Sequence, residues 1–272
     1  KKNTKSTMKK ILFFVCFLPL FTFAQALNGT YQIGTGQASP FNNLQNAIAR
    51  LNTNGVNGPV VFKLLNNESY TATLQINSFA GSSTTNTVTI EPAENKNVTI
   101  SVNNPNGYTG VAAVIKINGG DNIIINGNNS NNQNSRNLTL QNNNAVNYLS
   151  QTVFWIASNG TNAATNITIK NTILKNTNRN QDGLWLSGIF SGGNASTDNG
   201  TISNSMATAN NTNTQISNNE FINIRQGVHV NSNTNSTRIT NLTITNNKLI
   251  TTVDSQKPDM GFYINNVSNF RI

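Results

Sequence analysis

Carboxylates are the side chains of this sequence that could serve the widest range of catalysis, and they are few. The chain has nine Asp and Glu among its 272 residues. The aspartates stand singly, at Asp121, Asp182, Asp198, Asp254 and Asp259. Hydrolysis of a glycosidic bond uses two carboxylates that flank the bond, and a calcium site gathers several oxygen ligands. Scattered aspartates predict neither arrangement, so we expect no metal site and no cofactor.

Asp182 is the first of three weak catalytic candidates, and it lies in the segment Asn180-Gln181-Asp182-Gly183. In an inverting hydrolase it would need a second carboxylate across the scissile bond and a base for the attacking water. An Asp followed directly by Gly is also typical of a turn. We favour the turn, which predicts that Asp182→Asn is nearly silent. If Asp182 is catalytic, the same change should abolish turnover and leave the fold intact.

The other two catalytic candidates are His229, the only histidine, and Arg225, four residues before it. Imidazole is the side chain best suited to proton transfer near neutral pH. However, His229 stands between Val228 and Val230, and alternation along a strand places it on the opposite face from these valines. We therefore expect an outward-facing histidine that is solvated or adjacent to a turn, rather than a catalytic one.

Aromatic side chains are the candidates for contact with sugar rings, because they offer flat apolar faces. Trp185 is the candidate ligand-binding residue: it stands between Leu184 and Leu186, and alternation predicts that it faces outward. We expect Trp155 either to fill the interior or to lie beneath a long loop. The same alternatives are open for Phe190 and Tyr148.

The elements that must position these residues repeat along the chain. The clearest copies are residues 214–222 and 242–250, with a looser one at 169–176. Ile216 corresponds to Ile244 at an offset of 28 residues, and the same offset leads from Ile244 to Ile272. A short β-branched strand, an Asn turn and a second apolar pair at a fixed period are typical of a solenoid. In this register Glu220 and Lys248 stack, and we expect a cross-strand ion pair.

Short β-rich runs without helical periodicity continue this pattern from residue 67 onward. They are Thr73–Ile76, Thr87–Ile90, Val98–Val102, Ala113–Ile117, Ile123–Ile125, Leu138–Leu140, Val153–Ile156, Ile167–Ile169, Leu184–Leu186, Phe221–Ile224 and Val228–Val230. The 55 asparagines suit the turns between them, because Asn enters left-handed conformations readily and can stack in hydrogen-bonded ladders. We predict an all-β parallel β-helix over residues 67–272, with a long loop over residues 192–213.

Residues 26–66 are predicted to form an amino-terminal cap of strand, helix and strand. Ser39 is placed to cap the helix, Pro40 suits its first position, and Gly55 is placed to end it. One apolar face is formed by Leu44, Ala47, Ile48 and Leu51. The flanking strands are expected at residues 29–34 and, as a buried strand by its composition, at residues 60–65. A helix laid across the first coil covers its apolar end and its unpaired backbone.

Residues 8–25 are predicted to be a signal peptide. Met8-Lys9-Lys10 precedes an apolar run from Ile11 to Phe23, and small residues follow. The run is too short for a comfortable membrane span, so we expect none after cleavage; an uncleaved anchor is the alternative. The only cysteine, Cys16, lies inside this segment. A large exported chain without disulfides indicates a bacterial protein, secreted or on the outer cell surface.

The basic charge of the full chain comes largely from its amino terminus. Loss of Lys1, Lys2, Lys5, Lys9 and Lys10 leaves 13 of the 18 basic residues against nine acids, and the net charge falls from +9 to +4. The remaining basic residues are scattered and form no stripe that could follow a phosphate backbone. We therefore exclude nucleic acid as a partner.

Several segments, in order, match one known group of proteins. They are Phe23–Gln25, Gly29–Gly34, Phe41–Ile48, Gly55–Phe62 and Asn86–Ile90, within residues 8–140. On these residues the chain resembles the amino-terminal part of the secreted right-handed parallel β-helix proteins of gliding bacteria, which travel as type IX secretion cargo. The resemblance implies a right-handed β-helix, export, and a fragment whose sorting domain lies beyond Ile272. Such proteins include adhesins, polysaccharide-acting enzymes and proteins without known roles.

The β-helix enzymes supply the comparison for catalysis. Residues 180–183 are the nearest match to the Asn-Thr-Asp-Gly element of polygalacturonase-like hydrolases, but the Asp pair and the Gly-His-Gly element of those enzymes are absent. The paired aspartate elements of pectin methylesterases and the aspartate cluster of pectate lyases are not recognisable either. We therefore expect a surface module for adhesion, or for contact with a polysaccharide or another cell-surface ligand, without catalysis. The alternatives are a polysaccharide-acting lyase, hydrolase or esterase with part of its site beyond residue 272, and a plain stalk.

Overall fold

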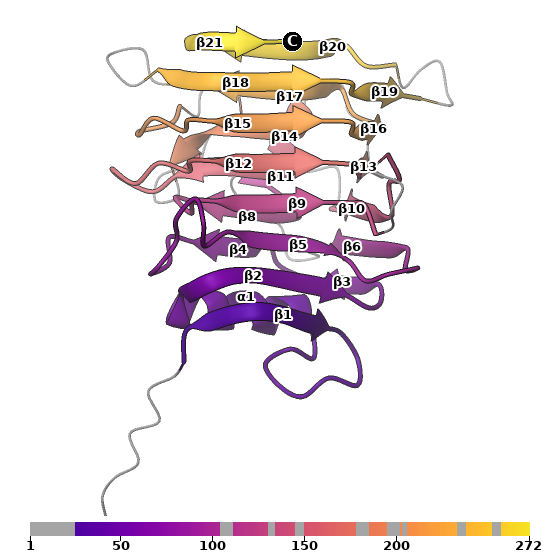
Figure 1. The fold of residues 1–272 in the computed structure, drawn as a ribbon. Coiled ribbons are helices and arrows are strands. Elements are labelled where there is room, and N and C mark those ends of the chain that lie inside the picture. Colours follow the sequence, from indigo (N-terminus) through magenta and orange to yellow (C-terminus); the bar gives the residue numbers. More distant parts are fainter. Residues whose placement is uncertain are drawn as a thin grey trace, which may run out of the picture.

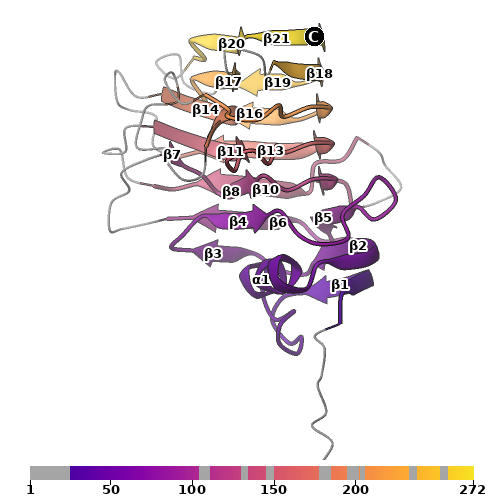
Figure 2. The same cartoon turned by 90° about the vertical axis from the view of Figure 1, so that its left-hand side faces the viewer.

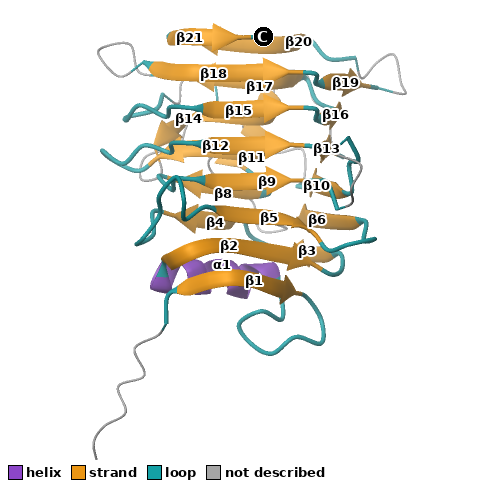
Figure 3. Cartoon of the chain, in the orientation of Figure 1, coloured by secondary structure: helices purple, strands orange, loops and turns teal. Residues whose placement is uncertain are grey.

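Short strands separated by Asn and Gly stack into three parallel sheets in the computed structural model (Figures 1 and 3). It describes residues 25–103, 111–129, 134–144, 150–177, 185–194, 202, 206–232, 238–251 and 257–272. The chain passes along the front sheet of Figure 1, returns through the side and back sheets, and rises by one strand with each circuit. This is a right-handed coil, the sense that parallel crossovers favour. The predicted all-β parallel β-helix is confirmed.

The strands divide among the sheets as follows. The front sheet contains β1 (Leu27–Ile33), β2 (Val56–Leu64), β5 (Val88–Pro92), β9 (Ile123–Asn126), β12 (Ile167–Lys170), β15 (Thr214–Ser217), β18 (Ile239–Thr245) and β21 (Val267–Arg271). The side sheet contains β3 (Glu68–Tyr70), β6 (Val98–Val102), β10 (Leu138–Asn142), β13 (Thr172–Asn176), β16 (Glu220–Ile222) and β19 (Lys248–Ile250). The back sheet contains β4 (Leu74–Asn77), β8 (Ile115–Asn118), β11 (Ser150–Ser158), β14 (Trp185–Asn194), β17 (Gln226–Asn231) and β20 (Met260–Asn265), and β7 (Val111–Ala112) pairs with β11. The three sheets are seen from the side in Figure 2.

Strand register confirms the repeat. Ile216 lies opposite Ile244 and also opposite Ile169, as the sequence copies predict. The shortest front-sheet coils advance by 28 residues, from Val60 to Val88 and from Thr214 to Leu242. Three coils between them are longer, because loops are inserted while the strand register is kept. The loops change the coil length and leave the stacked strands in place.

The predicted ion pair between Glu220 and Lys248 is wrong, although the two residues do stack. The carboxylate of Glu220 instead lies 4.0 Å from Arg136, on the segment that precedes β10. Arg136 also donates to the main-chain oxygen of Asn218 at 2.7 Å and to its side-chain oxygen at 2.6 Å. Arg136, which comes from another coil, therefore pairs with Glu220 in place of Lys248, the partner that the sequence spacing predicted.

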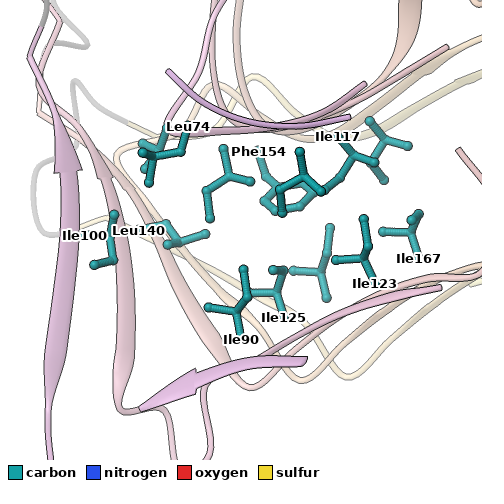
Figure 4. Close-up of a cluster of buried hydrophobic side chains, with 14 of the residues drawn as sticks. Leu74, Ile90, Ile100, Ile117, Ile123, Ile125, Leu140, Phe154 and Ile167 are labelled. Carbon is teal, nitrogen blue, oxygen red and sulfur yellow. The ribbon is translucent and has the colours of Figure 1, made fainter. Parts of the chain in front are cut away.

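Alternation along the strands builds the core. The buried strand predicted at residues 60–65 lies within β2, where Val60, Phe62 and Leu64 are buried while Val61 and Lys63, on the outward face, are partly exposed. Figure 4 shows side chains of the three sheets meeting in the interior: Ile90, Ile123, Ile125 and Ile167 from the front, Ile100 and Leu140 from the side, and Leu74, Ile117 and Phe154 from the back. Burying each such side chain stabilises the fold by about 1.5–3 kcal/mol.

Asparagine makes the turns, as predicted. Every described non-glycine residue with a positive φ is Asn, a conformation that this residue tolerates well. One ladder runs up the edge of the front sheet through Asn122, Asn166, Asn213, Asn241 and Asn269. From Asn166 upward, each side-chain amide nitrogen donates to the amide oxygen of the Asn in the coil below, at 2.8 Å for the first three steps. The turns are thereby tied from coil to coil.

The amino-terminal helix α1 (Leu44–Asn54) covers the first coil with the predicted apolar face, and Gly55 ends it with φ of 62°. The predicted start is wrong. The helix begins after Asn43, whose side-chain oxygen accepts from the Asn46 amide at 2.8 Å, while Ser39 and Pro40 lie in the preceding loop. The Leu44 amide donates to the Glu68 carboxylate at 2.9 Å. A residue on β3, in the next coil, thus completes the cap.

Most of the predicted signal peptide, residues 8–24, lies outside the described residues, so its cleavage stays a prediction. In the described ranges α1 is the only helix, and it is neither long nor apolar enough to cross a membrane. The expected loop over residues 192–213 begins later than predicted, because β14 continues to Asn194. Within that segment Ile202 and Ala207 are buried, so part of it packs against the solenoid.

Candidate functional site

Two of the residues singled out from the sequence cannot be placed. Asp182 and Tyr148 lie outside the described residues. Trp185 opens β14, but the structure does not describe its side chain. Whether Asp182 is a turn residue and whether Trp185 faces solvent therefore stay predictions.

His229 is buried, and the expectation of a solvated histidine is wrong. It lies on β17 with its ring stacked on Tyr263 at 4.5 Å and against the edge of Phe190 at 5.6 Å. Its Nδ1 donates to Gln226 Oε1 at 2.7 Å. Burial penalises the charged imidazolium and lowers the pKa of His229 to about 4. The ring is therefore neutral at physiological pH and is part of a packed layer.

That layer is a column of side chains on the outer face of the back sheet. In register order it consists of Lys116, Trp155, Phe190, His229 and Tyr263. The Lys116 ammonium lies 3.6 Å from the centre of the Trp155 ring, and the Trp155 and Phe190 rings are 6.0 Å apart. Alternation predicted the outward direction of His229 correctly, but gave no information on what covers this face.

Trp155 and Phe190 offer no surface to a sugar. Both are buried in a second apolar cluster outside the main core, together with Val111, Ala113, Ala157 and Ile202. Ile202 belongs to the long segment after β14, so of the two expectations for Trp155 the position beneath a loop is correct. The indole nitrogen donates to the Gly192 carbonyl at 2.7 Å. These contacts fix the aromatic rings in place.

Arg225 is not paired with His229 as a catalytic couple. Its guanidinium forms an ion pair with Asp259, which lies just before β20. His229 follows Arg225 by four positions along extended chain, so their Cα atoms are about 13 Å apart. The stacked coils therefore give each of them a different neighbour.

Five of the six described acids, all except the exposed Glu94, make structural contacts. Glu91 forms an ion pair with Lys63 at 2.5 Å, and Asp121 accepts from the amide and hydroxyl of Thr165 at 2.8 and 2.6 Å. Glu68, Glu220 and Asp259 have the partners given above. Among the described residues no group of three His, Cys, Asp or Glu could hold a metal ion. A paired-carboxylate site is not assembled from these acids.

A groove of about 350 Å³ lies on the outer face of the front sheet, across β12, β15 and β18. Its walls are Asn166, Thr168, Asn213, Thr214, Gln215, Asn241 and Thr243. Alternation creates it: the residues on either side of Thr168, Gln215 and Thr243 point into the core, so these three point outward in register. The asparagine ladder forms the adjacent wall.

The groove offers hydrogen-bonding groups and little else. Asn213 and Gln215 are exposed, and Thr168 and Thr243 are partly exposed. An amide has two N–H donors and an acceptor oxygen with two lone pairs, and each ladder step uses one donor and one acceptor position. The remaining positions and the hydroxyl groups of Thr168 and Thr243 can bind a ligand rich in hydroxyl groups. Strand spacing sets the rows about 4.8 Å apart.

Sequence reasoning anticipated the ladder but missed the groove. The signal was present in the two clearest copies, where Gln215 and Thr243 occupy equivalent positions between inward residues. A second hollow of about 490 Å³ lies on the outer side of α1 and is lined by Ser39, Pro40, Asn46, Ala49, Arg50, Thr53 and Asn54. No known protein family, curated protein or solved structure matches the chain.

Proposed function

We propose that this chain is an exported β-helix module that contacts a polysaccharide through the outer face of its front sheet, without catalysis. The groove across β12, β15 and β18 carries the proposal. Sugars present hydroxyl groups that both donate and accept, and the groove presents rows of amides and hydroxyls that do the same. The interaction site is a face of the solenoid, with no enclosed pocket required.

The absence of catalysis is part of this proposal, and the positions of the candidate residues support it. His229 is buried and Arg225 is held by Asp259. Glu68, Glu91, Asp121, Glu220 and Asp259 each make a hydrogen bond or ion pair that stabilises the coils. Export is supported by the signal-like residues 8–25 and by a remainder without cysteine. The resemblance to secreted β-helix proteins of gliding bacteria agrees with a place outside the cell.

The test measures binding and turnover together. The purified chain is incubated with a panel of soluble polysaccharides, and bound ligand and new reducing or unsaturated ends are recorded. We expect binding to at least one polysaccharide without new ends. New ends would overturn the non-catalytic part of the proposal and make Asp182→Asn the next variant. No binding by a chain that circular dichroism shows to be β-folded would overturn the proposal as a whole.

A further inference from the structure

We infer that the polysaccharide bound in the groove is anionic; this inference rests on the proposed function. Two basic side chains flank the hydrogen-bonding groups of the groove. Lys170 follows Thr168 by two residues in β12, so both project from the same face. Arg271 lies opposite Thr243 in the next coil. The rows of neutral polar groups are thus bounded by positive charge.

No acid in the part of the chain that the structure describes neutralises these two cations. No ion pair between described residues includes Lys170 or Arg271. The register neighbours of Lys170 are Asn126 and Ser217, which carry no charge. The four strands β12, β15, β18 and β21 contain no Asp or Glu. A ligand that brings negative charge to this part of the face would therefore meet no repulsion from these strands.

Lower on the same face of the front sheet, in contrast, a lysine is neutralised by an acid. There Lys63 in β2 is paired with Glu91 in β5 at 2.5 Å. Asn126 in β9 donates to the second oxygen of the same carboxylate at 2.8 Å. The column of outward residues that contains Lys170 thus begins with a neutralised pair, while Lys170, further up, has the uncharged Asn126 and Ser217 on either side. The unpaired positive charge lies beside the groove.

The spacing of the two cations suits an extended chain. β15 and β18 lie between β12 and β21. At about 4.8 Å per strand, Lys170 and Arg271 are about 14 Å apart along the solenoid axis. A polysaccharide with a carboxylate or sulfate on successive units can reach both while its hydroxyl groups meet the threonines and amides. Two cations are too few to hold a nucleic acid, which binds through many phosphate contacts.

The experiment compares matched charged and neutral probes. Affinities are measured for polygalacturonate against its methyl ester, and for dextran sulfate against dextran. Comparing the first pair with the second distinguishes carboxylate from sulfate as the preferred anion. The variants are Lys170→Gln, Arg271→Gln and their combination. Lys175→Gln is the control, because Lys175 lies on β13 in the same coil but in the side sheet.

We expect at least one charged probe to bind more tightly than its neutral partner. Each single variant should weaken that binding about three-fold and the double variant about ten-fold, as for exposed ion pairs. Lys175→Gln should leave it unchanged, and added salt should reduce it. Circular dichroism of each variant checks that the fold is intact.

Two results would overturn the inference while leaving the proposed function in place. One is equal binding of charged and neutral probes that is lost in the double variant Thr168→Val, Thr243→Val. The other is an equal loss in Lys175→Gln and Lys170→Gln, which would indicate diffuse charge rather than a site. Binding to none of the four probes would overturn the inference, and the broader polysaccharide panel would then decide the proposed function.

Discussion

The buried imidazole of His229 should make the protein sensitive to mild acid. In the folded chain its pKa is about 4, and the ordinary value is 6.5. At about 1.4 kcal/mol per pKa unit, this difference corresponds to about 3 kcal/mol of folding stability. The unfolded chain binds the extra proton more readily than the folded one. The contribution is therefore complete above pH 6.5, is lost as the pH falls towards about 4, and does not change further below that value.

The assay is urea unfolding at a series of pH values for the natural chain and for His229→Phe. Phenylalanine keeps an aromatic ring between Phe190 and Tyr263 and removes the titrating group. Carboxylates titrate in both proteins, so the difference between them isolates His229. We expect the natural chain to lose about 3 kcal/mol more than the variant between pH 7 and pH 4. Equal losses in the two proteins would refute the buried, neutral histidine.

Three further variants test the coil architecture by urea unfolding. Asn213→Ala should cost about 2–4 kcal/mol, because it breaks two ladder hydrogen bonds and puts Ala at a φ of 57° that Asn tolerates better, whereas Asn213→Gly, which has no Cβ to strain this conformation, should cost only about 1–2; equal costs would contradict a left-handed turn. Glu68→Ala should destabilise the cap by about 1–3 kcal/mol, because the Leu44 amide keeps only the Tyr70 hydroxyl oxygen as acceptor and that hydroxyl loses the carboxylate to which it donates; an unchanged midpoint would contradict this cap. Gly127→Ala should prevent the native stacking, because its Cβ would lie 1.8 Å from the Asn171 carbonyl oxygen; a natively stable Gly127→Ala variant would contradict the close approach.

The repeat explains why the architecture could be predicted from sequence. Ile216 and Ile244 are equivalent positions in consecutive coils, and in a parallel solenoid equivalent positions lie opposite each other. Asn is the residue other than Gly that best tolerates the turns, so its abundance indicated where the coils bend. These signals are local and periodic. They determine the coil and its direction of growth without information on the loops.

The predictions from sequence failed where a residue contacts side chains from other coils or from loops. Asn43 rather than Ser39 starts the helix, because Glu68 from the next coil completes the cap at that position. His229 is buried because the outer face of the back sheet carries a second apolar layer that includes Ile202. Loop packing of this kind has no period, so alternation along a strand cannot reveal it. The groove was missed because its residue types, Thr, Asn and Gln, are common throughout the chain.

The most direct test of a glycan-contacting front sheet compares two sets of threonine variants in a polysaccharide-binding assay. The double variant Thr168→Val, Thr243→Val removes two groove hydroxyls and keeps the β-branched shape. Thr89→Val is the matched control, because Thr89 occupies the same outward column on β5, outside the groove. We predict that the double variant weakens binding about ten-fold, at about 0.5–1.5 kcal/mol per hydrogen bond, while the control binds as the natural chain does. Unchanged binding in the double variant would contradict the account.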